Sequence, residues 1–196
     1  MKTTSLPKAI AMELQEAAVI TTYSGRHIDL LRPDPAVILI DDIAASLARQ
    51  NRFVGHTSRD YKVAEHCLLG TEFCVPAARL EFLMHDATEG LLGDCSGPLK
   101  ALAGMKFYRD LEAAWDEAIC QRFGIGRRFA KDVHVVDQRM LITEQRDLKG
   151  RMPVSTDKYR PFPWVLPARS LSSEQLKVQF LEEFYALVAR TEGAIR

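Results

Sequence analysis

The spacing of apolar residues from Asp41 onward restricts most strongly what this chain can fold into. Between residues 41 and 50 the apolar side chains recur at intervals of three and four, which places them on one face of a helix. Comparable helical segments follow at residues 62–74, 76–92, 105–123 and 130–148, and from Ser172 onward. Amphipathic helices must bury their apolar faces against one another. The sequence therefore predicts an all-α fold, a helical bundle of about five to seven helices around one core.

The first 35 residues follow a different pattern. Residues 17–22 are apolar and β-branched, Tyr23–Arg26 has the composition of a turn, and residues 27–31 alternate. This pattern predicts a short β-hairpin. We expect residues 1–35 to form a hairpin extension, and residues 36–196 to form one compact domain. With 47% hydrophobic residues, the chain can bury a sizeable core.

The C-terminal part begins with a proline-rich segment. Residues 149–170 contain four prolines and Trp164, which predicts an extended aromatic segment on the surface. The last helix has a clear start signal, because Ser172 and Gln175 have the spacing of a capping box. Leu171 and Leu176 have the spacing of the accompanying hydrophobic staple.

Charge argues against a nucleic-acid polymer as the partner. The 26 lysines and arginines are balanced by 26 aspartates and glutamates, so the formal net charge is zero. A protein that binds a nucleic-acid backbone usually carries a basic excess, because phosphate neutralisation dominates the affinity. A small phosphorylated ligand stays compatible with this balance, since a few local cations suffice to bind it.

The cysteines and the apolar runs indicate a cytoplasmic protein. No pair of cysteines has CxxC spacing, so we interpret Cys67, Cys74, Cys95 and Cys120 as reduced thiols. The apolar stretch near the N-terminus is interrupted by Glu13 and Glu16, which is unlike a signal peptide. No run approaches the roughly 18 apolar residues of a membrane span. We therefore expect no membrane partner.

Two histidines lie where helices are predicted. His66 and His85 are both expected in mid-helix, Asp86 follows His85 directly, and Glu89 comes one turn later. The segment around them is very apolar, so this polar cluster is expected to be buried. Burying two neighbouring carboxylates is costly unless a cation compensates their charge. Imidazole and carboxylate ligands together suit Mn, Fe, Co, Ni or Zn.

Each of these residues also has a simpler interpretation when taken alone. A single helical histidine is more often a core or surface residue than a ligand, and a His-Asp dipeptide by itself carries little information. His134 precedes Asp137 by three residues and shares a helix face with it. We interpret His134 as a partly exposed helix residue.

The order His66, His85-Asp86, Asp137 resembles the H…HD…D signature of the HD superfamily of metal-dependent phosphohydrolases. The likeness covers about Asp41–Leu148. Three local sequences carry it: Tyr61–Leu69, Phe82–Asp94 and Val135–Leu141. The resemblance implies a helical HD domain with one divalent transition metal, Co, Mn, Fe, Ni or Zn. Its implied ligands are His66, His85, Asp86 and Asp137.

Within this superfamily the chain is most similar to small bacterial 5′-deoxynucleotidases and to phage dATP triphosphohydrolases. This likeness implies that Glu89 assists the water and that Asp94 lies at the scissile phosphate. It also implies that Arg52 and Phe53 contact the substrate, although the aromatic residue there is often tryptophan. Lys100 is a further candidate phosphate contact.

Two features of the sequence are open to two interpretations. His56 either contacts the substrate or only forms local hydrogen bonds in its loop. Trp115 belongs either to the core or to a dimer interface, since the enzymes that this chain resembles are commonly homodimers.

Four functions remain open at this point. The first is hydrolysis of the 5′-phosphate of a (deoxy)nucleoside monophosphate, and the second is release of triphosphate from a dNTP. The third is a metal- and nucleotide-binding module without turnover. The retained Glu89 and Asp94 argue against this third function, because a binding module needs neither. The fourth is a closed structural metal site with four protein ligands.

Overall fold

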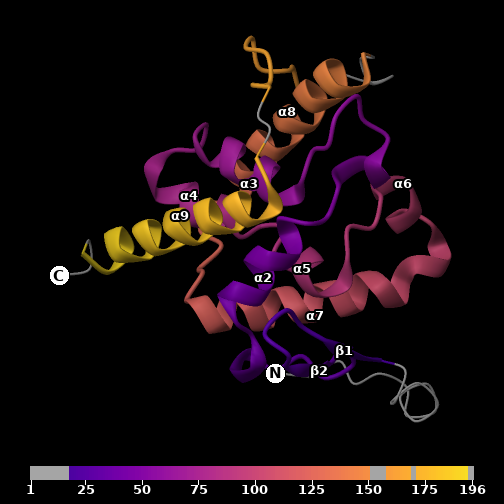
Figure 1. Cartoon of the computed structure of the whole chain (residues 1–196), viewed down its shortest axis with the longest axis vertical. Coiled ribbons are helices and arrows are strands. Elements are labelled where there is room, and N and C mark those ends of the chain that lie inside the picture. Colours follow the sequence, from indigo (N-terminus) through magenta and orange to yellow (C-terminus); the bar gives the residue numbers. More distant parts are fainter. Residues whose placement is uncertain (1–17, 151–157, 169–170, 194–196) are drawn as a thin grey trace.

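The computed structural model describes residues 18–150, 158–168 and 171–193. These residues form a helical bundle with a two-stranded hairpin near the N-terminus, which confirms the predicted fold class (Figure 1). The α-helices are α2 Ile40–Leu47, α3 Val63–Thr71, α4 Arg79–Leu83, α5 Glu89–Leu92, α6 Gly97–Lys100, α7 Lys106–Phe123, α8 Ala130–Lys149 and α9 Ser173–Gly193. Short 3-10 helices are η1 Pro35–Val37, η2 Arg52–Gly55, η3 Pro76–Ala78 and η4 Ala103–Met105.

The predicted helix 76–92 is divided, so the placement of His85 in mid-helix was wrong. Helix α4 ends at Leu83, and α5 begins only at Glu89. His85 and Asp86 lie in the intervening turn. The backbone and the Nδ1 atom of His85 both bond to the carbonyl of Phe82, at 3.2 and 2.6 Å. Because the side chain takes this carbonyl, the regular helical hydrogen-bond ladder ends here.

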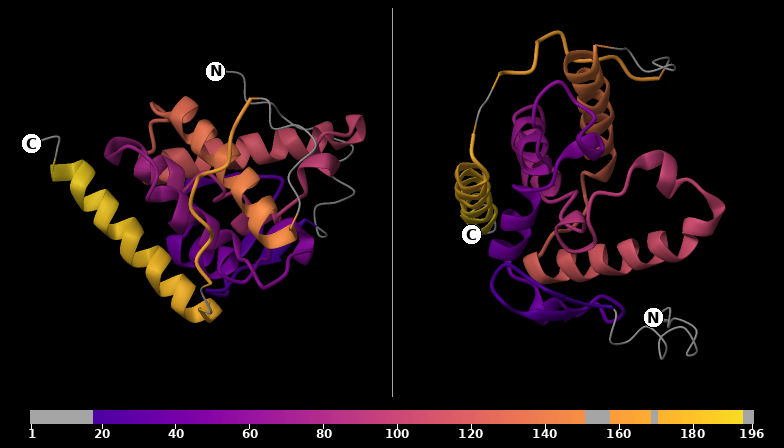
Figure 2. Two further views of the ribbon diagram at one scale, coloured as in Figure 1. Left: turned by 90° about the horizontal axis from the view of Figure 1, so that it is seen from above. Right: turned by 45° about the vertical axis from the view of Figure 1, so that its right-hand side comes forward.

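The predicted N-terminal hairpin is present. Strand β1, Val19–Thr21, pairs antiparallel with β2, His27–Asp29, and Ile20 lies opposite Ile28. The hairpin and α8 lie at opposite ends of the molecule (Figures 1 and 2). Residues 1–17 of the predicted extension lie outside the described residues.

Trp115 of α7 joins the hairpin to the core. The ring is fully buried, and its Nε1 atom donates to the carbonyl of Leu30 at 2.8 Å. The core interpretation of Trp115 is therefore confirmed, and the alternative dimer contact is wrong.

Helix α3 lies between two apolar clusters. Ala64 and Cys67 belong to the larger cluster, with residues of α2, α7 and α9, while Leu69 belongs to the smaller one. The smaller cluster joins α3 to α4, α8 and the segment 158–168. The side chains of α3 are consequently buried on most sides, and its polar residues need partners within the protein.

Two glycines allow close helix packing beside the His85-Asp86 turn. A Cβ atom on Gly70 of α3 would lie 2.2 Å from ring atoms of Phe82 in α4. A Cβ atom on Gly90 of α5 would lie 3.2 Å from the Cα atom of Ile43 in α2. These contacts fix α4 and α5, and therefore the turn between them, against α3 and α2.

The C-terminal predictions agree with the structure where it describes them. Gln175 and Ser172 exchange side chain to backbone hydrogen bonds of 2.9 and 3.2 Å, which confirms the capping box. Residues 158–168 form the expected irregular, aromatic segment, and Arg146 of α8 donates to the carbonyls of Phe162 and Trp164. Residues 151–157 and 169–170 lie outside the described residues. None of the helices in the described residues has the length and apolarity that a membrane span requires.

Candidate metal centre

His66 lies on α3 and is completely buried. Its Nδ1 atom lies 2.5 Å from Oε1 of Glu144 on α8. Glu144 is ionised, because Arg52 and His66 hold its pKa at about 2 although burial alone would raise it. A carboxylate only accepts hydrogen bonds, so Nδ1 of His66 carries the hydrogen. The Nε2 atom of His66 therefore faces the interior of the site.

His85 is oriented in the same way by a different acceptor. Its Nδ1 atom donates to the carbonyl oxygen of Phe82 at 2.6 Å. Its Nε2 atom lies 3.3 Å from Nε2 of His66. Ligating histidines in metalloproteins usually donate their other ring nitrogen to a carboxylate or a carbonyl, as both rings do here.

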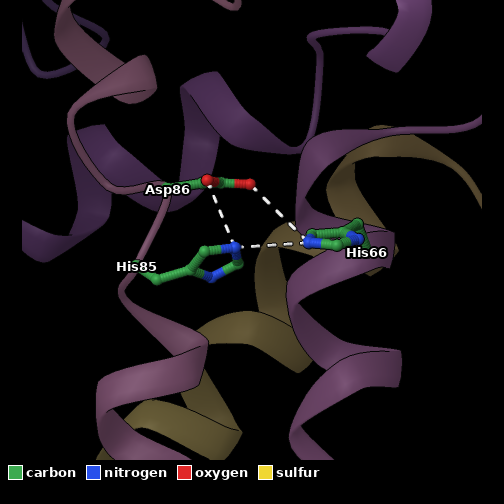
Figure 3. A group of neighbouring side chains, drawn as sticks. All are labelled: His66, His85 and Asp86. Atoms are coloured by element: carbon green, nitrogen blue, oxygen red, sulfur yellow. Dashed lines mark hydrogen bonds and ion pairs between the residues drawn. The ribbon is translucent and has the colours of Figure 1, made fainter. Parts of the chain in front are cut away.

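Two carboxylates complete the cluster. Asp86 lies 3.2 Å from Nε2 of His85 and 3.8 Å from Nε2 of His66. Figure 3 shows these three side chains pointing toward one another. Oδ1 of Asp137, on α8, lies 3.4 Å from Nε2 of His66 and 3.6 Å from Nε2 of His85. The structure thus brings together all four residues predicted as ligands, from α3, the α4–α5 turn and α8.

The geometry fits a bound divalent metal. Two ring nitrogens that face each other at 3.3 Å repel unless a proton or a metal lies between them. Zn²⁺ binds imidazole nitrogen at about 2.0–2.1 Å, so two adjacent nitrogen ligands lie about 3.0–3.4 Å apart. The mixed set of nitrogen and oxygen donors suits a transition metal.

Charge favours a cation at the same place. Burial and Arg52 lower the pKa of His66, but the neighbouring carboxylates outweigh them and raise it above its ordinary value. Burial would raise the pKa of Asp137, yet the neighbouring imidazoles of His66 and His85 hold it far below its ordinary range. The site contains more acidic than basic side chains: Asp86, Glu89, Asp94, Asp137 and Glu144 against Arg52 and Lys100.

Glu89 and Asp94, the predicted catalytic residues, border this cluster. Burial, followed by the charges of Asp86 and Asp94, raises the pKa of Glu89 to about 9. Its Oε2 atom is buried and has no hydrogen-bond partner among the described residues. Burial also raises the pKa of Asp94. Gln50 joins the two residues, because its side chain donates to the carbonyl of Glu89 and accepts from the backbone N–H of Asp94, both at 2.8 Å.

The two predicted phosphate contacts already have partners within the protein. Nη1 of Arg52 donates to Asp86 at 3.0 Å, and its Nε lies 3.3 Å from Glu144. Nζ of Lys100 lies 2.5 Å from Glu112 and 3.7 Å from Glu89. Arg52 therefore lies beside the predicted ligands and compensates the charge of their carboxylates.

The remaining candidates lie away from the two imidazoles. The ring of Phe53 lies beneath the Arg52 guanidinium and near the Lys149 ammonium, with centroid distances of 5.6 and 5.0 Å. His56 is exposed, in a surface hollow formed by residues 55–58 and 147–150. His134 is exposed and packs edge-to-face on Tyr159 rather than joining the cluster.

Sequence comparison identifies relatives of this chain. No model of a known protein family matches it. Over 129 residues the chain is 38% identical to the uncharacterized protein YfdR of Escherichia coli K12, an alignment that covers 66% of this chain and 71% of YfdR. The chain belongs to the YfdR family. It is also 44% identical over 111 residues to an uncharacterized protein of Rhodobacter capsulatus. That alignment covers 52% of this chain and 56% of the relative.

The site of this YfdR-family protein contains residues that sequence reasoning missed. Glu144 is completely buried and accepts hydrogen bonds from His66 and from the Tyr61 hydroxyl. It follows Asp137 by seven residues, which is two helical turns, so both lie on the same face of α8. That spacing was the one available signal. Tyr61 and Gln50 gave none, because each contacts a residue that is distant in sequence.

Proposed function

We propose that this protein is a metal-dependent phosphohydrolase that removes the 5′-phosphate of a (deoxy)nucleoside monophosphate. The observation that supports it best is the pair of Nε2 atoms of His66 and His85, which face each other at 3.3 Å among carboxylates. The resemblance to the HD superfamily supports the same chemistry. His66, His85, Asp86 and Asp137 would hold one divalent transition metal.

The metal would supply Lewis acidity toward a phosphate oxygen and would acidify water in the site. In the reaction, water adds to phosphorus, the P–O bond to the nucleoside breaks, and the leaving oxygen takes a proton. Glu89 is buried whereas Asp94 is only half-buried, and burial favours the protonated carboxyl, so we assign Glu89 as the acid. Asp94, held beside it by Gln50, is then the group that accepts the proton of the water.

The charge of the site favours a monophosphate over a triphosphate. Arg52 and Lys100 are both ion-paired with protein carboxylates. A triphosphate would bring several more negative charges to a site that already has an acidic excess, and would need additional cations. A binding module without turnover explains Glu89 poorly, because its partnerless Oε2 atom costs stability and serves no structural contact.

One assay separates these functions. Purified protein is incubated with Mn²⁺ or Co²⁺ and a panel of nucleoside and deoxynucleoside mono- and triphosphates, and the products are identified. We expect inorganic phosphate from a monophosphate. Release of triphosphate would instead establish a triphosphohydrolase, and the absence of any product would contradict hydrolysis.

The proposed metal ligands are tested separately with a variant of Asp86. Asp86→Ala should lower both bound metal and turnover by more than about 100-fold, because it removes a ligand and the partner of Arg52. Asp110→Ala is the control, since Asp110 pairs with Lys106 on the exposed side of α7. Full metal content and full activity in Asp86→Ala would refute the site.

A further inference from the structure

Glu144 lies directly behind His66, on the side away from the proposed metal. Its carboxylate is completely buried, and Oε1 lies 2.5 Å from Nδ1 of His66. The same oxygen accepts the hydroxyl of Tyr61 at 2.8 Å. A buried carboxylate is costly even when a cation compensates part of its charge, so its position against one imidazole requires a reason.

The other oxygen of Glu144 faces Arg52. Its Oε2 atom lies 3.3 Å from Nε of Arg52, and both atoms lack a well-aligned hydrogen bond. Arg52 reaches Asp86 with Nη1 at 3.0 Å. One guanidinium therefore joins Glu144 to a proposed ligand, and Glu144 is held from two sides, by Tyr61 and by Arg52.

We propose that Glu144 is a positioning residue that makes His66 a metal ligand. It accepts the Nδ1 hydrogen, so the lone pair of Nε2 points at the metal and the ring cannot rotate. Its negative charge also makes the imidazole a stronger donor to the metal. This proposal rests on the proposed metal site, and it assigns a function to a residue outside the H…HD…D pattern.

The chain provides a matched control. Glu65 is also a buried glutamate that pairs with an arginine, Arg59, and it is adjacent to His66 on α3. Its carboxylate binds Arg59 rather than an imidazole. Glu144→Gln and Glu65→Gln therefore make the same chemical change, and both remove the charge of a buried glutamate that faces an arginine, but only the first changes the acceptor of His66.

The first measurement is calorimetric titration of each folded protein with Mn²⁺ alone. We expect Glu144→Gln to weaken Mn²⁺ binding by about 10- to 100-fold, and Glu65→Gln to bind within about twofold of the unsubstituted protein. Equal affinity of Glu144→Gln and the unsubstituted protein would overturn the role of Glu144. If Glu65→Gln weakened Mn²⁺ binding as much as Glu144→Gln, the loss would reflect lower fold stability rather than the changed contact to His66.

The second measurement detects the Nδ1 hydrogen of His66 directly by NMR. In the Zn²⁺-loaded protein, the Nδ1–H proton of His66 should give a strongly downfield NMR resonance, because it lies in a short bond to a carboxylate. The resonance should move upfield in Glu144→Gln and stay in place in Glu65→Gln. Its absence from the unsubstituted loaded protein would overturn the proposal.

A third variant covers the case in which Glu144→Gln does not fold. Tyr61→Phe removes the hydroxyl that shares Oε1 with His66, so the His66 resonance should shift. An unchanged resonance in folded Tyr61→Phe would contradict the arrangement. Failure of the unsubstituted protein to bind Mn²⁺ or Zn²⁺ would refute the proposed metal site, whereas binding that is insensitive to Glu144→Gln refutes only the positioning role.

Discussion

Two arginine–glutamate pairs lie beside α3, and they differ in how completely their atoms are paired. Glu65 and His66 are consecutive, yet Glu65 contacts Arg59 while His66 contacts Glu144, the partner of Arg52. The residue types in the two pairs are the same. The comparison therefore separates what an ion pair does for the fold from what it does in a site.

The pair of Arg59 and Glu65 is closed. The guanidinium donates to both carboxylate oxygens, at 2.8 and 3.1 Å, and to the carbonyl of Pro167. This two-point geometry is the strongest form of the interaction. The pair joins the loop before α3 to the segment 158–168, and we assign it a structural role.

The pair of Arg52 and Glu144 is open. Within the described part of the chain, Nε of Arg52 and Oε2 of Glu144 lack hydrogen-bond partners, as does Oε2 of Glu89 nearby. Unpaired buried polar atoms are costly and tend to occur where a site sacrifices stability for function. The difference agrees with a structural role for the pair that contains Glu65 and with the proposed metal site beside His66.

The largest effect on stability is expected from a change in the close packing of α3 against α4. Gly70→Ala places a Cβ atom 2.2 Å from the Phe82 ring, which is completely buried. Overpacking should lower the free energy of unfolding by about 2–3 kcal/mol, even after the gain in helix propensity. Urea denaturation measures the loss. The control is Gly104→Ala, where nothing lies within 4 Å, and equal stability of both variants would contradict the packing.

An intermediate effect on stability is expected when the ion pair of Arg59 and Glu65 is broken. Glu65→Gln removes the charge opposite Arg59 and should lower the free energy of unfolding by about 1–2 kcal/mol. The loss stays moderate because Arg59 keeps 24% of its side chain exposed to water. Urea denaturation in metal-free buffer measures it. A gain in stability would show that this pair is not the structural member of the comparison.

The third effect is a gain in stability rather than a loss, and it depends on pH. The pKa of Glu89 rises from 4.5 to about 9, so in metal-free protein the folded state binds one more proton than the unfolded state between those values. Stability from this group therefore falls as pH rises through that window. Glu89→Gln removes this dependence, so its stability relative to the unsubstituted protein should rise as the pH increases toward 8.5.

The measurement for Glu89→Gln is urea denaturation with EDTA at several pH values. The stability difference between the variant and the unsubstituted protein should be small near pH 5 and should grow toward pH 8.5. A variant that is less stable than the unsubstituted protein at pH 8.5 would show that Glu89 supports the fold as Glu65 does.

The sequence by itself determined what depends on neighbours within a turn or two. The helical segments, the hairpin and the capping box of Ser172 and Gln175 could be predicted because their hydrogen bonds and apolar faces arise locally. The residues His66, His85-Asp86 and Asp137 were predicted from their order and from family resemblance, and the structure brings them together.

Tertiary structure alone decided how those residues are supported. Glu144 contacts His66 across 78 residues and Tyr61 across 83, so no local pattern joins them. The turn that carries His85 was predicted as helix, because helix propensity does not register a side chain that takes the carbonyl of Phe82. Arg52 was predicted to face a phosphate, yet packing places it against two carboxylates of the protein. Such contacts form between segments that only the folded core brings together, and their energies depend on burial that the sequence does not specify.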